Sequence, residues 1–86
     1  EDKNTIMAVE AKSTPLIAHI YAHIERIGFL REYLDRKGDA RRCQGALAGI
    51  VISGEVRDFA LKKGLFLIEP SGKTSVITAP PAVKSW

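Results

Sequence analysis

The first clear pattern along the chain is a short apolar run followed by alternating polar positions. Residues 6–9 are Ile-Met-Ala-Val, and Glu10-Ala11-Lys12 follows, which predicts a β-strand over residues 6–12. Side chains two residues apart in a strand point to the same face. We therefore expect Glu10 and Lys12 to lie side by side.

A helical pattern covers residues 15–37. Ser13 or Thr14 followed by Pro15 predicts its start, because a hydroxyl caps the first turn and proline suits the first helical position. Apolar residues at three- and four-residue steps form one stripe, which consists of Leu16, Ile20, Ile24, Ile27, Leu30 and Leu34. Gly38 and Asp39 end the pattern, as a glycine after the last helical turn commonly does.

A second, weaker apolar stripe lies on the far side of the same helix. It consists of Ala18, Ala22, Phe29 and Tyr33. A helix that covers one small sheet needs only one apolar face. We therefore expect this stripe to contact a second copy of the chain or a segment that precedes residue 1, and the sequence leaves both alternatives open.

The rest of the chain repeats the alternation of strand and helix. Residues 44–53 are predicted to be a buried strand whose glycines and alanines leave room for a neighbouring helix. Ser53 is the predicted N-cap of a short helix, which Lys62-Lys63-Gly64 closes. Two strands, over residues 65–68 and 73–78, flank a turn at Pro70-Ser71-Gly72, and residues 79–86 form an irregular tail.

The resulting order, β-α-β-α-β-β, predicts an α/β fold with a small, mixed, largely parallel sheet. Helical crossovers impose parallel pairing on the first three strands, and the closing hairpin adds one antiparallel strand. A length of 86 residues allows one domain, residues 1–86. Because the chain starts without Met and enters a strand at once, we expect it to be a fragment of a longer domain.

Cysteine content and hydropathy indicate the compartment. The single cysteine, Cys43, cannot form an internal disulfide, which fits a reducing environment. The longest strongly apolar stretch, residues 46–52, is too short to cross a bilayer, and no leader opens the chain. We therefore expect a cytoplasmic protein with no membrane association.

The charge is mildly basic and uneven. The net charge is +3 and the isoelectric point about 9.3, which favours a polyanionic partner only weakly. Cations gather at the end of the long helix and in the loop after it: Arg31, Arg36, Lys37, Arg41 and Arg42. They are either solvated side chains favoured by the helix dipole, or a patch in which Arg36, Lys37, Arg41, Arg42 and the nearby Gln44 contact DNA or RNA.

Glu10-Ala11-Lys12 is the best candidate for chemistry. Hydrolysis of a phosphodiester at neutral pH needs a divalent cation, an activated water and positive charge near the phosphorus. The carboxylate of Glu10 and the carbonyl of Ala11 are the oxygen ligands that Mg²⁺ prefers, and Lys12 would supply the positive charge. The alternative is an ordinary surface ion pair between Glu10 and Lys12.

The surroundings of this pair resemble a known superfamily. The similarity rests on Val9-Glu10-Ala11-Lys12-Ser13, on Gly45-Ala46-Leu47-Ala48-Gly49, and on the run from Glu55 through Lys62-Lys63-Gly64-Leu65-Phe66-Leu67-Ile68 to Ser71-Gly72. These segments resemble the C-terminal half of PD-(D/E)xK, or restriction-endonuclease-like, nuclease domains. More narrowly, they resemble an uncharacterised prokaryotic branch of that superfamily.

The resemblance implies a partial restriction-endonuclease-like fold in which Glu10 is a metal ligand and both Glu10 and Lys12 are catalytic. Such domains also use an aspartate on the preceding strand. Asp2 lies in the turn that enters the Glu10 strand, so we expect the true partner to precede residue 1. The superfamily includes inactive members. The chain is therefore either part of a Mg²⁺-dependent nuclease, inactive as an isolated fragment, or a non-catalytic module that binds a protein or nucleic acid.

His19 and His23 are a second candidate, since histidines four residues apart on a helix can share a zinc ion. The residue after His19 is Ile20 rather than the glutamate of a metalloprotease motif, and no third ligand is evident. Both histidines flank the main apolar stripe of the helix. We expect them to be half-buried residues at the edge of the core.

Overall fold

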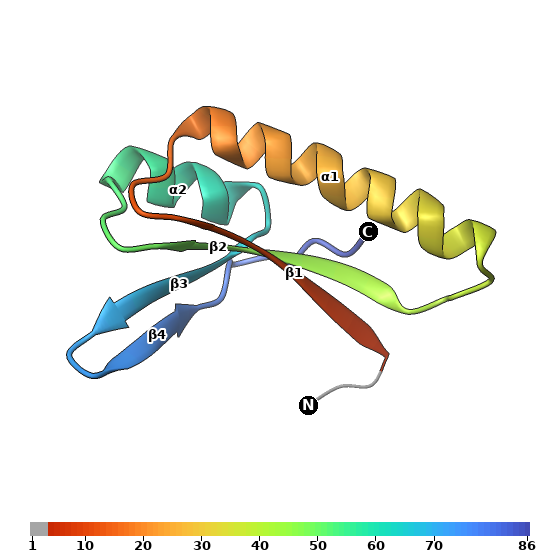
Figure 1. The fold of residues 1–86 in the computed structure, drawn as a ribbon. Coiled ribbons are helices and arrows are strands. Elements are labelled where there is room, and N and C mark those ends of the chain that lie inside the picture. Colours follow the sequence, from red (N-terminus) through yellow and green to blue (C-terminus); the bar gives the residue numbers. More distant parts are fainter. Residues whose placement is uncertain (1–3) are drawn as a thin grey trace.

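The computed structural model describes residues 4–86 as a four-stranded sheet with two helices (Figure 1). The elements are β1 (Thr5–Lys12), α1 (Ile17–Arg36), β2 (Arg42–Gly49), α2 (Gly54–Lys62), β3 (Phe66–Ser71) and β4 (Thr74–Thr78). This is the predicted β-α-β-α-β-β order, so the α/β class and the mixed sheet are confirmed. No helix in the described part of the chain is both long and apolar enough to cross a membrane.

The strands lie in the order β1-β2-β3-β4. β1 pairs parallel with β2 and β2 parallel with β3, as the helical crossovers require, while β4 returns antiparallel to β3. In the β1–β2 register Thr5 is opposite Arg42 and Lys12 is opposite Gly49. β1 is therefore one edge of the described sheet, and its carboxyl end lies level with that of β2.

Both helices lie on the same side of the sheet (Figure 1). The core lies between these layers, and its fully buried side chains include Ile20 and Ile27 from α1 and Leu47, Leu65 and Leu67 from the sheet side. Gly45 permits this packing, because a Cβ at that position would lie 2.6 Å from Ile27 Cδ1 and 2.7 Å from Leu65 Cδ2. The expectation that small residues on this strand admit a helix is confirmed at this position.

Two boundaries differ from the predictions, because hydrogen bonds from neighbouring segments override the local pattern. β2 ends at Gly49 rather than at Ser53, since the amides of Ile50 and Val51 both turn to donate to the carbonyl of Ser13, at 3.1 and 3.0 Å. The apolar pattern of Ile50 and Val51 suggested a buried strand, but their exposures are 68% and 61%. The hairpin turn also comes later than predicted, at Gly72, because Pro70 and Ser71 still pair with β4.

The start of α1 differs as well. The helix begins at Ile17, and its N-cap is Leu16 rather than Ser13 or Thr14. The side chain that caps this end is His19, whose Nδ1 accepts from the amide of Leu16 at 2.9 Å. A histidine three residues into a helix is not among the favoured capping residues, so the sequence gave no signal for this contact.

Apolar side chains remain exposed on both outer surfaces of this single chain. On α1 the predicted far stripe faces solvent, with Phe29 exposed by 59% and Tyr33 by 50%. Ala18 is exposed and Ala22 half-buried. On the uncovered face of the sheet Val9 is exposed by 50% and Ile77 by 65%. The interpretation of the far stripe as a contact surface stays a prediction.

Candidate functional site

Glu10 and Lys12 project from the carboxyl end of β1 toward the helices. Their side chains lie on the same face, as the strand period predicts, with Glu10 Oε2 and Lys12 Nζ 3.8 Å apart. The side chain of Glu10 is only 18% exposed and that of Lys12 is 42% exposed. The carboxylate thus lies partly beneath α1, while the lysine reaches outward at the rim.

Two side chains from α1 complete the surroundings of this carboxylate. Arg26 donates from one guanidinium nitrogen to Glu10 Oε1 at 2.5 Å, and His23 Nδ1 lies 4.0 Å from the same oxygen. His23 and Arg26 are three residues apart, so they share the face of α1 above β1. We call Glu10, Lys12, His23 and Arg26 the Glu10 cluster.

His23 is a structural member of this cluster. It is 4% exposed, and its Nε2 lies 3.0 Å from the carbonyl oxygen of Ala8. A carbonyl only accepts hydrogen bonds, so Nε2 carries a proton and donates it to β1. With His19 capping the start of α1, each histidine has a separate role, and the pair does not converge on one ion. The prediction that they lie at the edge of the core is accurate for His19, whereas His23 is buried further.

The cluster neutralises a carboxylate that has lost much of its contact with water. Removing a charge from water costs free energy unless a partner compensates, and Glu10 has both Arg26 and Lys12 within ion-pair distance. The side chain of Arg26 is 60% exposed, so solvent reaches more than half of its surface. The carboxylate is therefore the fixed member of this pair and the arginine the solvent-facing one.

The described residues alone do not make a magnesium site. Mg²⁺ demands near-octahedral oxygen coordination, and Glu10 supplies one carboxylate, of which one oxygen is engaged by Arg26. Within residues 4–86 no group of three or more His, Cys, Asp or Glu side chains is placed to hold a metal ion. Asp2, the upstream acid considered from the sequence, lies outside the described residues.

The predicted nucleic-acid contacts are not brought to this cluster. Arg42 pairs with Thr5 at the amino end of β1, and at about 3.3 Å per residue this is roughly 23 Å along the strand from Lys12. Arg36, Lys37 and Arg41 lie at this same end of the sheet, around the end of α1 and the loop after it, and all three are exposed. Gln44 is half-buried and on the face of β2 opposite to that of Gly45, hence away from Glu10.

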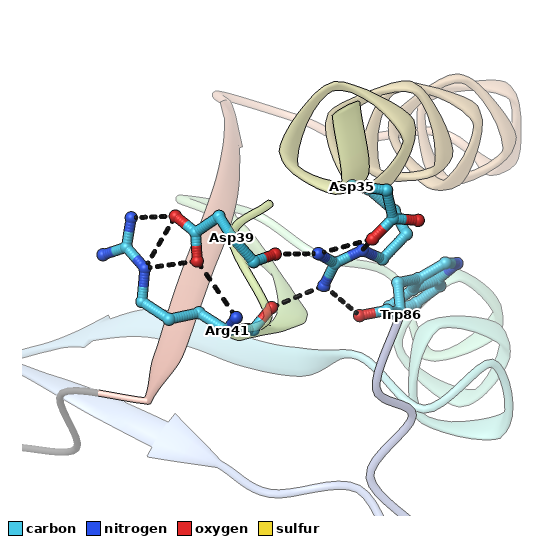
Figure 2. A network of polar contacts seen from close by, with 5 residues as sticks. Asp35, Asp39, Arg41 and Trp86 are labelled. Carbon is cyan, nitrogen blue, oxygen red and sulfur yellow. Dashed lines mark hydrogen bonds and ion pairs between the residues drawn. The ribbon is translucent and has the colours of Figure 1, made fainter. Parts of the chain in front are cut away.

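Several of the cations at that far end belong to a polar network (Figure 2). Arg31 donates to the carboxylate of Asp35 and to the carbonyl oxygens of Asp39, Arg41 and Trp86. Arg41 in turn binds both carboxylate oxygens of Asp39, and this hydrogen bonding lowers the pKa of Asp39 to about 2. Arg31 and Arg41 are therefore committed to intramolecular contacts, whereas Arg36, Lys37 and Arg42 remain exposed candidates for a phosphate.

The network also fastens the tail. The main chain of Trp86 exchanges two hydrogen bonds with that of Cys43, at 2.7 and 3.0 Å, and its side chain packs against the core. Residues 79–86 have no helix or strand, as predicted, yet they return to the start of β2 and end below α1 (Figure 1).

A hollow of about 410 Å³ lies at the carboxyl ends of β1, β2 and β3, mainly on the face of the sheet away from the helices, since Ala11, Ala48 and Ile68 alternate with the helix-facing row of Glu10, Leu47 and Leu67. Its walls include Lys12 and Ser13 from the end of β1, Ala48 from β2, and Ile68 from β3. Of the Glu10 cluster, Lys12 is the member that lines this hollow.

In comparisons with known proteins, no protein-family model, curated protein or solved structure matches the chain.

Proposed function

We propose that this chain is the C-terminal part of a PD-(D/E)xK nuclease-like domain that, in the full-length protein, hydrolyses phosphodiester bonds of DNA or RNA with a divalent cation. The observation that supports this most is the placement of Glu10 and Lys12. They lie 3.8 Å apart at the carboxyl end of β1, beside a hollow that Lys12 lines. The similarity of the sequence around them to such domains points the same way.

In this proposal Glu10 is a metal ligand and Lys12 stabilises charge on the scissile phosphate. One carboxylate binds Mg²⁺ poorly, so a further acidic ligand from outside the described residues is a requirement of the proposal. The isolated chain of 86 residues is accordingly expected to be inactive. The restriction-endonuclease-like fold is part of the same proposal, because residues 4–86 form a β-α-β-α-β-β unit that would be only a portion of it.

A second candidate function is a non-catalytic nuclease-fold module that binds nucleic acid or protein. The contact between Arg26 and Glu10 at 2.5 Å favours it, because a carboxylate engaged by arginine is less available to a cation. The exposed cations Arg36, Lys37 and Arg42, at the other end of the sheet, would serve such binding without chemistry.

The test is cleavage by the full-length protein of labelled single- and double-stranded DNA and RNA in Mg²⁺ or Mn²⁺. Glu10→Gln and Lys12→Ala should each lower the rate by about 10²–10⁴-fold, since each removes an essential charge. Glu32→Gln and Lys73→Ala, which change exposed residues of the same types elsewhere, should cut at the wild-type rate.

Thermal melts of all four variants verify the fold, so that a lost activity reports on the site. If the full-length protein cuts none of these substrates, and wild type and Glu10→Gln bind metal equally, the enzyme proposal fails. The binding-module function then takes its place.

A further inference from the structure

The first half of β2 has an open edge on the side of β3. β2 pairs with β1 along its whole length, from Arg42 to Gly49. β3 begins at Phe66, opposite Ala46, and pairs with β2 only from Ala46 to Ala48. The part of β2 before Ala46 therefore presents main-chain donors and acceptors that β3 does not reach. A strand edge of this kind can pair with another extended segment.

The tail of the chain fills this edge. The amide of Cys43 donates to the carbonyl of Trp86 at 3.0 Å, and the amide of Trp86 donates to the carbonyl of Cys43 at 2.7 Å. This two-bond exchange is the pattern of a hydrogen-bonded antiparallel pair. Residues directly opposite each other in such a pair have side chains on the same face. The ring of Trp86 thus lies beside Cys43 on the helix-covered side, where it packs against the core.

Gly64 forms the other wall of the seat. Its carbonyl accepts from the amide of Lys84 at 3.2 Å. A Cβ at this position would lie 2.7 Å from Lys84 Cβ and 2.8 Å from Lys84 N, and the φ of +85° also favours glycine. We call the main chain of Cys43 and Gly64, with the space for the Trp86 ring, the tail slot. It holds the backbone of an extended segment and one aromatic side chain.

The tail is attached to the rest of the molecule by few contacts. In the described part of the chain, three main-chain hydrogen bonds join residues 79–86 to other segments, two at Cys43 and one at Gly64. Residues 81–85 are exposed. Pro80 and Pro81, which precede the docked part, have no amide hydrogen and favour an extended chain. The slot contacts only the docked residues, so the same contacts can form with the tail of another copy.

We propose that the tail slot is an interface between two copies of this chain, in which residues 82–86 of each copy dock into the slot of the other. The second copy is the occupant because its tail carries the segment that is seen to fit. The closed monomer and the exchanged pair share the same contacts, so protein concentration sets the balance between them. The slot lies at the amino end of β2, away from Glu10, so the exchange does not depend on the proposed function.

The experiment mixes two complementary variants of the full-length protein, labelled with a donor and an acceptor fluorophore. Trp86→Gly removes the anchor of the tail and leaves the slot open. Gly64→Ala blocks the slot with a Cβ and leaves the tail intact. Neither variant can exchange tails with itself, whereas the mixture combines one open slot with one intact tail. Energy transfer in the mixture should report pairing about 30-fold tighter or more than in either variant alone, the usual effect of one tryptophan anchor.

Ser85→Gly is the matched control for Trp86→Gly. It introduces a glycine at an exposed neighbouring position but keeps the Trp86 ring, so the slot stays filled by its own tail. Mixed with Gly64→Ala, it should pair much more weakly than Trp86→Gly does. Thermal melts verify that each variant is folded.

A synthetic peptide of residues 79–86 replaces the Gly64→Ala copy if that variant does not fold. The fluorescein-labelled peptide should bind Trp86→Gly, followed by fluorescence polarisation, and should bind about 30-fold more weakly when its tryptophan is replaced by glycine. In amide NMR spectra of Trp86→Gly, the unlabelled peptide should shift the signal of Cys43, whose amide donates to the docked segment.

The outcomes separate exchange from other modes of association. Pairing that is no tighter in the mixture than in either variant alone overturns the proposal, as does equal pairing with Ser85→Gly. Peptide binding that leaves the Cys43 signal unmoved also overturns it, because the peptide then binds elsewhere. Peptide binding at Cys43 without pairing of the two variants leaves a slot for a free segment of another protein and contradicts exchange between copies.

Discussion

The middle of α1 and its carboxyl-terminal part each carry an arginine that contacts other segments, and the two arginines have opposite surroundings. Arg31, toward the carboxyl end, donates to one carboxylate and three main-chain carbonyls, and its side chain is 20% exposed. Arg26, five residues earlier, contacts one carboxylate oxygen and is 60% exposed. An arginine that donates to several main-chain carbonyls holds the segments that carry them together. An arginine with a single side-chain partner can more easily exchange that partner for another.

The carbonyls that accept from Arg31 come from separate segments of the chain. They belong to Asp39, Arg41 and Trp86, so one guanidinium ties the end of α1 to the next loop and to the tail (Figure 2). In the Glu10 cluster the tie to the main chain comes from His23, which donates to the carbonyl of Ala8, while Arg26 contacts no main-chain acceptor among residues 4–86. If the account is correct, substitutions of Arg31 and of Arg26 should separate stability from binding.

The largest expected effect on stability is that of Arg31→Ala. Three carbonyls and one carboxylate lose a charged donor, which should lower the free energy of unfolding by about 3 kcal/mol. Urea denaturation followed by circular dichroism measures this, with Arg36→Ala as the control, expected within about 0.5 kcal/mol of wild type. Equal stability of Arg31→Ala and Arg36→Ala would contradict the structural role given to Arg31.

Gly45→Ala tests the close approach of α1 to the sheet at Ile27, next to Arg26 in the helix. The new Cβ would meet Ile27 at 2.6 Å and Leu65 at 2.7 Å, so overpacking should cost about 1–3 kcal/mol. Gly28→Ala is a matched control on α1, since its Cβ would meet nothing within 4 Å and alanine favours a helix by up to about 1 kcal/mol. A melting temperature that falls for Gly45→Ala and rises for Gly28→Ala fits the packing described; the reverse order contradicts it.

Arg26→Ala should have a smaller effect on stability than either Arg31→Ala or Gly45→Ala. An ion pair with an exposed arginine contributes about 0–1 kcal/mol, so the urea midpoint should shift little. The same denaturation series measures it beside Arg31→Ala. A loss of stability as large as that of Arg31→Ala would mean that Arg26 also holds the structure together, and the contrast between Arg26 and Arg31 would fail.

The smallest expected effect is a pH dependence at the Arg31 end. The hydrogen bonds from Arg41 hold the pKa of Asp39 at about 2 in the folded protein, below its ordinary value of 3.8. The stabilisation is therefore complete above the ordinary value and is lost as the pH falls toward 2. Asp39→Asn should flatten this part of the curve of stability against pH, measured by urea midpoints. Since the pair is at the surface, the change should be small.

Local patterns were sufficient for the element order and for the shared face of Glu10 and Lys12. Strand period fixes which side chains point together, and the period changes from two to about four where α1 begins. The same reasoning anticipated Gly45 as a point of close approach, because a small residue in a buried strand usually admits a neighbour.

The partners of Glu10 were not predictable from these patterns. His23 and Arg26 reach the carboxylate only because α1 crosses above β1 in one register, which is set by packing of residues such as Ile27 against Gly45. The distance between Glu10 and the exposed cations was not predictable either. Arg42 lies on β2, the strand next to β1, but the parallel register puts it opposite Thr5, at the end of β1 away from Glu10.

The most direct test of a cation site at Glu10 is paramagnetic broadening by Mn²⁺ in amide NMR spectra of the full-length protein. The proposed function predicts that trace Mn²⁺ selectively broadens the signals of Glu10, Lys12 and Arg26. Signals of Asp39 and Arg41, at the far end of α1, should stay sharp, and Glu10→Gln should abolish the broadening. Broadening centred on Asp39, or unchanged in Glu10→Gln, would contradict the account.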